Sequence, residues 1–444
     1  MQRPSPAHRR NTQRRRTRRR TTVPVAVAAT AAIALTACGP AADGPAAGEG
    51  VERSDAERTV VAVADAPASA DAVRATEELG LLALRAAEDP EENALVSPAS
   101  LSFALALLAE GAGGDTAAAL DEALGASGAD RTAAYNALQG ALAEHDGDPA
   151  VAQDDELPED PVLHLANQAV LDDELEVDPD YLDRIATAFD AGVQRTDLGS
   201  DSGKRVLDAW VNQHTGGLIE KSAIEPDLDL RMVLQNAVLL AARWETPFAE
   251  HSIADKDFTG PSGTEPTEML QAAERFAYAE SAGWAAVRLP YVDAFHADIL
   301  LPPVGTDPAD VTPEALTALT TALDAEKPRL VDLAMPSLEL EPPMLDLAPA
   351  LEEAGLGGLY GTPDLSGITP NGGLQVSQAM QQAYLSMDQA GTVAAAVTEI
   401  ALKESAVPAD PEVTMHVDRP YLLRIAHTET GLPLFLAAVR SPQH

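Results

Sequence analysis

The pattern of apolar residues along the chain predicts an α+β fold. Between residues 67 and 88, apolar side chains recur at helical spacing, so this segment is expected to be a helix. Residues 232–240 form a nearly continuous apolar run, which is typical of a strand buried on both faces. Further along, strands at 275–278, 285–289 and 296–301 indicate a second sheet. Helices and sheets are therefore expected in the same chain.

The composition is that of a soluble globular protein. At about 150 residues per domain, the 444 residues would suggest two or three domains. Hydrophobic residues make up 45% of the chain and aromatic residues only 4%, so a large core must be built from alanine, leucine and valine. The formal net charge is −40, although residues 1–37 contain nine arginines and no acidic residue. The strongly acidic remainder repels nucleic acid and anionic membranes, so no nucleic-acid partner is expected.

Residues 1–37 are predicted to be a secretory signal peptide. A basic run at residues 9–20 precedes an apolar run at residues 23–37 that is too short to span a membrane as a folded helix. Leu-Thr-Ala-Cys at residues 35–38 resembles the bacterial lipobox, which implies that Cys38, the only cysteine, receives a diacylglycerol and becomes the mature N-terminus. An ordinary signal peptide with release into the medium is the alternative. The Sec and twin-arginine export routes both stay open.

Residues 38–66 are predicted to be a flexible, lipid-anchored tether. They are rich in Gly, Ala, Pro, Asp and Glu and lack apolar periodicity. The folded domain is expected at residues 67–444, outside the cytoplasm and held at the cell membrane through Cys38. This domain contains no cysteine, so its fold needs no disulfide although an exported protein could form one.

Further elements follow from local signals. Ser97 and Ser100 flank a proline at the start of a helix, where serine is a good cap and proline suits the first turn. Asn236 interrupts the apolar run at 232–240, and a buried amide must be hydrogen-bonded. The other predicted helices span 101–110, 179–189, 202–214, 313–325 and 345–353, and the other predicted strands span 94–96, 163–171, 375–387, 413–417, 421–427 and 433–439.

Residues 391–411 combine the features of a loop and of a strand. Read with period two from Thr392 to Lys403, one face carries no charge, whereas Glu399 and Lys403 lie on the other face. The segment is rich in alanine, begins at a glycine and runs into two prolines, as loops do. It is therefore interpreted as a loop that can become a strand. The uncharged face consists of Thr392, Ala394, Ala396, Thr398, Ile400 and Leu402.

Together with several shorter motifs, this segment resembles the serpin family of serine-protease inhibitors, over roughly residues 67 to 442. The resemblance implies one domain with about eight to nine helices around three β-sheets and an exposed reactive-centre loop. It also implies a monomer without a cofactor whose partner is a serine protease. The shorter motifs are Asn-Ala-Leu-Val-Ser-Pro-Ala-Ser at 93–100, Asn236-Ala-Val, Asp364-Leu-Ser-Gly-Ile and Asp418-Arg-Pro-Tyr-Leu-Leu.

The resemblance also implies a mechanism and assigns roles to residues. A protease attacks the loop, its serine forms an acyl bond, and the cut loop inserts into the central sheet before water completes the reaction. Trp244 matches the family's turn where the loop enters the sheet. The reactive-loop hinge comprises Gly391, Thr392, Ala394, Ala395, Ala396 and Thr398, and the polar cluster under the sheet comprises Ser97, Ser100, Asn236 and Gln381.

Two arguments place the cleaved bond near Ser405 and Ala406. Glu404 is the first charge on the otherwise uncharged face, and burying it unpaired would be costly, so insertion should end there. Family spacing from the hinge glycine points to the Ser405–Ala406 bond. These small residues suit an elastase-like or subtilisin-like protease, whereas Lys403 as the recognised residue would imply a trypsin-like one. Every bond from Lys403 to Ala406 stays open.

The chain departs from the family pattern at several places. Gln389-Ala390 replaces an acidic pair, Val393 a glutamate and Gln381 a histidine, and residues 435–437 read Phe-Leu-Ala in place of Phe-x-Gly. None of these blocks insertion sterically, and the hinge contains no bulky, charged or proline residue. The hinge composition therefore favours an inhibitor over the alternative, a non-inhibitory serpin that acts as a binding or carrier module at the membrane.

The sequence carries no catalytic constellation of its own. It has no His-Glu-x-x-His motif, no paired cysteines and no Gly-x-Ser-x-Gly elbow. Its nine histidines are scattered without metal-ligand spacing. Neither an enzyme nor a metal protein is therefore expected.

Overall fold

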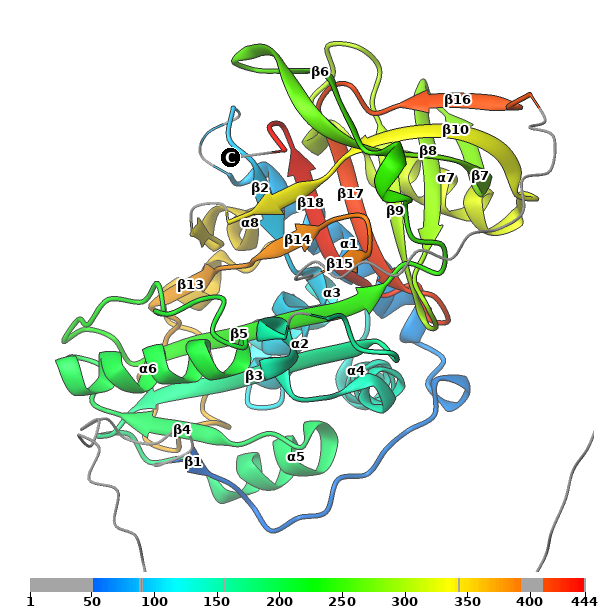
Figure 1. Cartoon of the computed structure of the whole chain (residues 1–444). Helices are drawn as coiled ribbons and strands as arrows, with labels where there is room; N and C mark the ends of the chain where they lie inside the picture. Colours follow the sequence, from blue (N-terminus) through cyan, green and yellow to red (C-terminus); the bar gives the residue numbers. More distant parts are fainter. Residues whose placement is uncertain are drawn as a thin grey trace, which may run out of the picture. The chain divides into compact units, whose positions relative to one another are not determined.

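The computed structural model describes residues 51–442, apart from 88, 90, 155, 342–343, 393–409 and the side chain of Asn236. The described residues form eight α-helices and two hydrogen-bonded β-sheets (Figure 1), which confirms the predicted α+β class. The helices are α1 (Ser69–Arg85), α2 (Pro98–Ala109), α3 (Gly114–Ala123), α4 (Gly128–Leu142), α5 (Pro179–Phe189), α6 (Asp201–His214), α7 (Pro313–Ala325) and α8 (Ala348–Glu353).

The first sheet is built around β5 (Met232–Arg243). Met232 and Leu240 pack into the main core, whereas Val233 packs with Leu207 of α6 on the opposite face. Both faces of β5 are therefore covered, as its continuous apolar sequence predicts. The strand order is β1 (Val51–Glu52), β4 (Val193–Thr196), β3 (Val162–Asp172), β5, β15 (Gly391–Thr392), β14 (Leu385–Met387) and β11 (Leu338–Leu340), with β13 (Gln378–Gln381) paired to both β5 and β12 (Leu345–Asp346).

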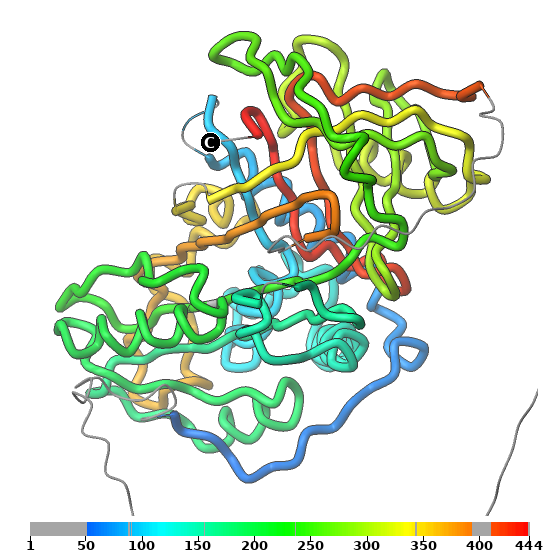
Figure 2. The backbone as a smooth tube through the Cα atoms, viewed as in Figure 1, coloured from blue at the N-terminus to red at the C-terminus, as the bar shows by residue number. Residues whose placement is uncertain are grey.

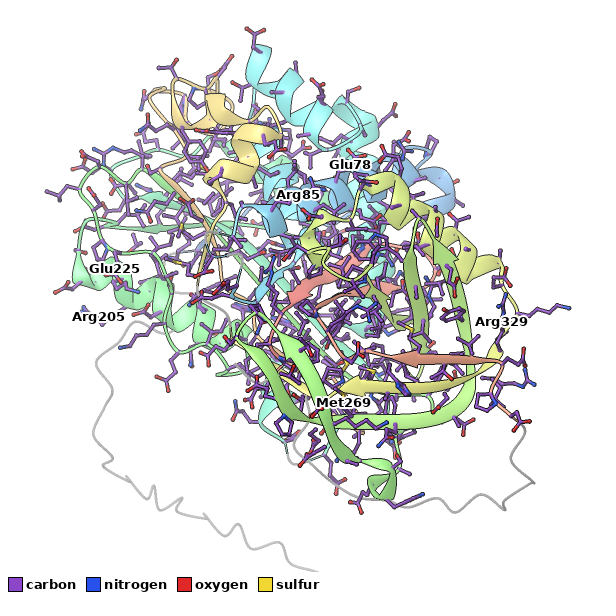
Figure 3. All side chains as sticks on the ribbon, turned by 90° about the horizontal axis from the view of Figure 1, so that it is seen from above. Glu78, Arg85, Arg205, Glu225, Met269 and Arg329 are labelled. Atoms are coloured by element: carbon purple, nitrogen blue, oxygen red, sulfur yellow. The ribbon has the colours of Figure 1, made fainter. Side chains whose placement is uncertain are left out.

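The second sheet is held together by the long strand β7 (Gly263–Ser281). Its first part pairs with β6 (Ala254–Gly260) and β10 (Arg329–Pro336), and its last part pairs with β8 (Trp284–Pro290). Figure 3 labels Met269 and Arg329, which lie at opposite ends of the β7–β10 ladder. The three sheets implied by the family resemblance form two hydrogen-bonded sheets here, because β7 continues from one part into the next. The order is β16 (Val413–His416), β10, β7, β8, β9 (Phe295–Leu301), β17 (Tyr421–His427), β18 (Pro433–Val439) and β2 (Ala94–Val96).

Helix α2 contacts both sheets and is buried along its whole length. Its residues are almost all apolar, and a helix that is apolar on every side requires such surroundings. The side chain of Ser97 caps the helix by accepting a hydrogen bond from the backbone N–H of Ser100 at 3.3 Å, and Pro98 occupies the first turn. These are the local roles that the sequence predicts for both residues.

Residues 51–66, which the sequence assigns to a flexible tether, pack against the domain (blue in Figure 2). β1 pairs with β4, and the backbone N–H of Thr59 donates to Thr187 O at 2.9 Å. The side chain of Asn136 accepts from the N–H of Val61 and donates to Thr59 O, both at 2.7 Å. The polar composition of this segment does not reveal these partners. Ordered contacts therefore begin earlier in the chain than expected.

Three other elements differ from the sequence-based expectation. Helix α4 has no counterpart among the predicted helices, because Arg131 and Asn136 lie on its buried side and interrupt the apolar stripe. Residues 345–353 divide into β12 and α8 rather than forming one helix. The strand expected at 375–387 is divided into β13 and β14, because β13 pairs with β5 and β12 whereas β14 pairs with β11 and β15.

Candidate functional site

A gap opens in the first sheet beside β5. On one side, β3 pairs with residues 232–241 of β5. On the other side, β13 pairs only with residues 233–234, and β15 pairs only with residues 242–243. Within the described part of the chain, residues 235–241 therefore have no strand partner on this side. Unpaired backbone groups at a strand edge are a ready position for a further strand.

The short strand β15 occupies one end of this gap. It runs antiparallel to both neighbours, with Thr392 opposite Ala242 of β5 and opposite the last residue of β14. The N–H of Asp388 donates to Gly391 O at 3.0 Å, and the carboxylate of Asp388 accepts from the N–H groups of Ala390 (2.7 Å) and Gly391 (3.1 Å). The first two residues of the sequence-predicted hinge therefore already belong to the sheet.

Gly391 lies too close to β5 to carry a side chain. A Cβ atom at this position would be 2.1 Å from the carbonyl oxygen of Ala242 and 2.8 Å from Cα of Arg243. Both neighbours are backbone atoms of a central strand, so they cannot turn aside as a side chain would. Glycine is therefore required here for close approach of two backbones.

Trp244 and Tyr291 form an aromatic platform at the hinge. Their rings stack with centroids 4.2 Å apart and an interplanar angle of 10°. Trp244 Nε1 donates to Asp388 O, and its backbone N–H donates to Ala390 O, both at 2.9 Å. Thr392 is fully buried, and its hydroxyl forms a hydrogen bond with that of Tyr291. The tryptophan that the sequence assigns to loop entry thus contacts the turn from which the loop departs.

Burial shifts the titratable groups of the hinge toward their neutral forms. It raises the pKa of Tyr291, against a smaller opposite effect of the hydrogen bond from Thr392. It also raises the pKa of Asp388, although two backbone N–H donors favour the carboxylate. Over the described residues, no group of three or more His, Cys, Asp and Glu side chains could hold a metal ion. The geometry of this site is suited to holding a strand.

The polar cluster predicted under the sheet is brought together in part. Gln381 Oε1 accepts from the N–H of Ser97 at 2.9 Å, and Gln381 Nε2 donates to Ser97 O at 3.2 Å. Ser100 joins through its backbone N–H. The side chain of Asn236 lies outside the described residues, and its backbone pairs with Asn167 of β3. Gln381, which stands where the family commonly has histidine, therefore ties β13 to the start of α2.

The segment that follows α6 covers the gap. Residues 215–224, together with β5 and residues 380–384, enclose cavities of only about 10 and 30 Å³. Gln235 of β5 holds this segment by donating to Ser222 Oγ (3.2 Å), and it also donates to Leu207 O of α6 (3.3 Å). Residues of this segment therefore lie against β5 and residues 380–384, and a strand that enters between them must displace the covering segment.

The remaining site residues predicted from the sequence lie outside the described residues. The segment 393–409 begins after β15, in the first sheet, and ends shortly before β16, at the edge of the second sheet (Figure 1). Its two ends are thus attached to different sheets. The residues concerned are Ala394, Ala395, Ala396, Thr398, Ser405 and Ala406 in this segment, and Cys38 before the first described residue.

A pair of histidines fastens α6 to the same sheet. His214, the last residue of α6, has Nδ1 2.8 Å from Nε2 of His164 on β3, and His164 Nδ1 is 3.0 Å from Asp146 Oδ1. Burial lowers the pKa of His214 to about 4, and the charge of His164 acts in the same direction while Asp146 opposes it. His214 is therefore neutral at pH 7, where a neutral imidazole can share the hydrogen bond with His164.

We expect the intact protein to lose stability as the pH falls below about 6.5, the pKa of an unperturbed histidine. Between pH 6.5 and about 4 the unfolded chain binds a proton at residue 214 that the folded chain does not bind, so acid favours unfolding. The thermal midpoint should decrease from pH 7.5 to pH 5, and this decrease should be smaller in His214→Gln. Exposed His251→Gln is the control, and an identical pH profile for His214→Gln and the parent would contradict the assignment.

Sequence and structure both match known proteins. The sequence model of one protein family, described as Serpin (serine protease inhibitor), matches residues 78–442. The chain belongs to the serpin family. Iripin-2 from Ixodes ricinus is 29% identical over 378 residues, which cover 82% of this chain and 92% of that protein. Members of this family are generally protease inhibitors.

Solved serpin structures share the fold. The native state of tengpin, a thermophilic serpin, superposes with a TM-score of 0.69 at 24% identity and covers 83% of this chain and 94% of that chain. Human thyroxine-binding globulin in complex with thyroxine gives a TM-score of 0.72 at 23% identity and covers 85% of this chain and 100% of that chain. These similarities confirm the predicted serpin fold.

Two residues at the hinge are not singled out by the sequence. Asp388, three residues before Gly391, matches the Asx-turn pattern, which is a signal present in the sequence. Tyr291 gives no such signal, because its contact with Thr392 joins residues 101 positions apart. Local patterns cannot reveal a contact of this kind.

Proposed function

We propose that this serpin is a suicide-substrate inhibitor of an extracytoplasmic serine protease of the elastase-like or subtilisin-like class. The observation that carries the proposal is the placement of β15. The first two hinge residues are hydrogen-bonded between β5 and β14, and β5 continues beyond them without a strand partner on that side in the described residues. A cut loop would extend a strand that has already begun.

The register of β15 supports insertion of the uncharged face of the loop into the core. If Thr392 opposite Ala242 is continued along β5, then Ala394 comes opposite Leu240 and Leu402 opposite Met232. Residues directly opposite in an antiparallel pair project to the same face. Ala242, Leu240 and Met232 all pack in the main core. The same register directs Glu399 and Lys403 to the face covered by α6.

The pairing of β5 also divides insertion into two stages. Residues 393–399 would lie opposite residues 235–241 of β5, where no strand has to be removed. Residues 400–402 would lie opposite residues 232–234, and β13 now pairs with β5 at 233–234. Full insertion therefore requires β13 to separate from β5, in addition to movement of the covering segment.

A covalent complex is the direct test of inhibition. The secreted domain is incubated with pancreatic elastase or subtilisin and separated on a denaturing gel, with protease whose serine has been blocked as the control. A band that combines both proteins only with active protease supports the proposal, and mass spectrometry of the released C-terminal fragment then decides among the bonds from Lys403 to Ala406. Complete cleavage at the loop without a complex favours the binding or carrier module instead.

We further propose that the protein is anchored to the cell membrane through a lipid on Cys38. No helix in the described residues is long and apolar enough to cross a membrane. The proposal is supported by the Leu-Thr-Ala-Cys motif and the preceding signal peptide.

Cys38→Ser should remove the lipid and leave the protein unprocessed or released. The inhibitory domain should be unaffected, because the family match begins only at residue 78. Labelling cells with a radioactive fatty acid, followed by separation of membrane and medium, measures both effects. The anchor is refuted if the parent protein takes up no label and is recovered from the medium.

A further inference from the structure

A polar cavity lies at the free edge of β3, away from the hinge. β4 pairs only with residues 169–172 of β3, so the first part of β3 has no strand neighbour on that side in the described residues. Side chains from α2, α4, α5 and α6 close over this edge and leave a cavity of about 250 Å³. Phe103, Phe189 and Trp210 supply aromatic walls, and Arg58 of the N-terminal segment also lines the cavity.

Several polar atoms around this cavity have no partner. Nε and Nη2 of Arg58, Oε1 of Gln139 and Oδ1 of Asn167 are all buried and make no hydrogen bond with the described residues. The two carboxylates that line the cavity are engaged elsewhere, since Asp190 pairs with Arg53 and Asp146 with His164. Two of the three guanidinium nitrogens of Arg58 are thus buried without a partner, although the residue as a whole is only partly buried. Nitrogens of a cation that have lost water without gaining a counter-charge are costly.

Water alone could satisfy the amide oxygens, since the cavity is polar and large enough for several molecules. Water does not provide a negative counter-charge for Arg58. It is also not stabilised by contact with the aromatic walls. The volume is slightly below the range of about 300–1,000 Å³ that is typical of small-molecule sites, which restricts a ligand to one ring.

We propose that this cavity binds a small aromatic monocarboxylate. The carboxylate pairs with Arg58, the ring packs among Phe103, Phe189 and Trp210, and a hydroxyl or amino group on the ring donates to Gln139 or Asn167. Arg58 is the specificity-determining residue, because a guanidinium favours a carboxylate over a neutral amide of the same shape. This ligand site is separate from the hinge and does not depend on inhibition of a protease.

Isothermal titration of the intact secreted domain with benzoate, 4-hydroxybenzoate and 4-hydroxybenzamide tests the proposal. We expect saturable binding of the two carboxylates, and affinity for the neutral amide should be lower by at least about tenfold, as expected for loss of a charged hydrogen bond. This comparison needs no variant. Absence of saturable binding of both carboxylates up to about 10 mM, well above the millimolar Kd of a weak ligand, would show that the cavity holds only water.

Arg58→Gln locates the bound carboxylate. The variant should lose at least about tenfold in affinity for 4-hydroxybenzoate, whereas Arg205→Gln on the exposed surface of α6 (Figure 3) should bind like the parent. Asn167→Leu should weaken 4-hydroxybenzoate more than benzoate, because only the former has a hydroxyl to donate. Equal affinity in Arg58→Gln and the parent would place the carboxylate elsewhere and overturn the assignment.

Discussion

Replacing Thr392 by arginine should convert the protein from an inhibitor into a substrate. Thr392 is fully buried in β15, and its hydroxyl contacts that of Tyr291. An arginine there would have to leave water and enter the core beside Ala242. The side chain of Thr392 contacts a hydroxyl, not a carboxylate, and the carboxylate of Asp388 is already engaged by two backbone N–H groups. An unpaired buried charge costs several kcal/mol, and about 3 kcal/mol already corresponds to about a hundredfold in rate. Protease would then complete hydrolysis before the loop inserts.

The ratio of cleaved inhibitor to covalent complex measures this change. Thr392→Ser is the matched control, because it retains the hydroxyl that contacts Tyr291 and adds no bulk. We expect nearly all of the arginine variant to be cleaved and released, whereas the serine variant should trap protease like the parent. Equal trapping by the arginine variant and the parent would mean that insertion of the loop does not require residue 392 to be buried in the sheet.

The sequence predicts those helices and strands that are determined by their own residues. The bounds of α5 and α7 agree with the predicted ranges 179–189 and 313–325, because each helix has a proline at its first position and a capping side chain, Asp178 or Thr312, before it. The continuous apolar run of β5 likewise predicts that both faces of this strand are buried. Elements such as α4 are missed because tertiary partners neutralise their buried polar residues.

Contacts between distant residues are the part that the sequence does not predict. Arg424 pairs with Glu77 at 2.8 Å and with Asp298 at 3.2 Å, deep between α1 and the second sheet, although these residues are separated by 347 and 126 positions. The positive charge of Arg288, at 2.6 Å, also stabilises the carboxylate of Asp298. The pKa of Asp298 is lowered in spite of full burial, because hydrogen bonds and charges from His296 and Arg288 outweigh desolvation.

The hinge likewise combines features that the sequence predicts with features that it does not predict. Period-two alternation assigns Thr392 to the uncharged face, and the register with Ala242 directs that face toward the main core. The sequence does not reveal that two hinge residues are already paired, that Asp388 closes the turn, or that residues 215–224 cover the gap. Each of these features depends on packing between segments that only the folded chain brings together.

Cleavage of the loop near Ser405 should make the protein more resistant to heat. In the intact form, residues 235–241 of β5 have no strand partner beside the gap within the described residues. Insertion of residues 393–402 would supply ladder hydrogen bonds, each worth about 0.5–1.5 kcal/mol, and would bury Ile400 and Leu402 at about 1.5–3 kcal/mol each. Ordering the loop costs about 1–2 kcal/mol per residue in backbone entropy, so these local gains alone do not determine the sign.

Two further contributions favour the cleaved form. The inserted strand would pair on both edges, with β5 and with the β13–β14 side, so successive inserted residues would hydrogen-bond alternately to the two neighbouring strands. Cleavage also frees the loop from its second attachment near β16, which otherwise holds the two ends in different sheets.

The thermal midpoint should therefore rise by at least about 10 °C, since 1 kcal/mol corresponds to about 2 °C in a domain of this size. Thr392→Arg cut at the same bond is the control and should show little or no increase, because its loop cannot insert. An ordinary exposed loop would give the opposite result, with a midpoint unchanged or lowered by nicking. A cleaved parent protein that melts no higher than the intact one would exclude insertion of residues 393–402, and with it the inhibitory mechanism proposed for this serpin.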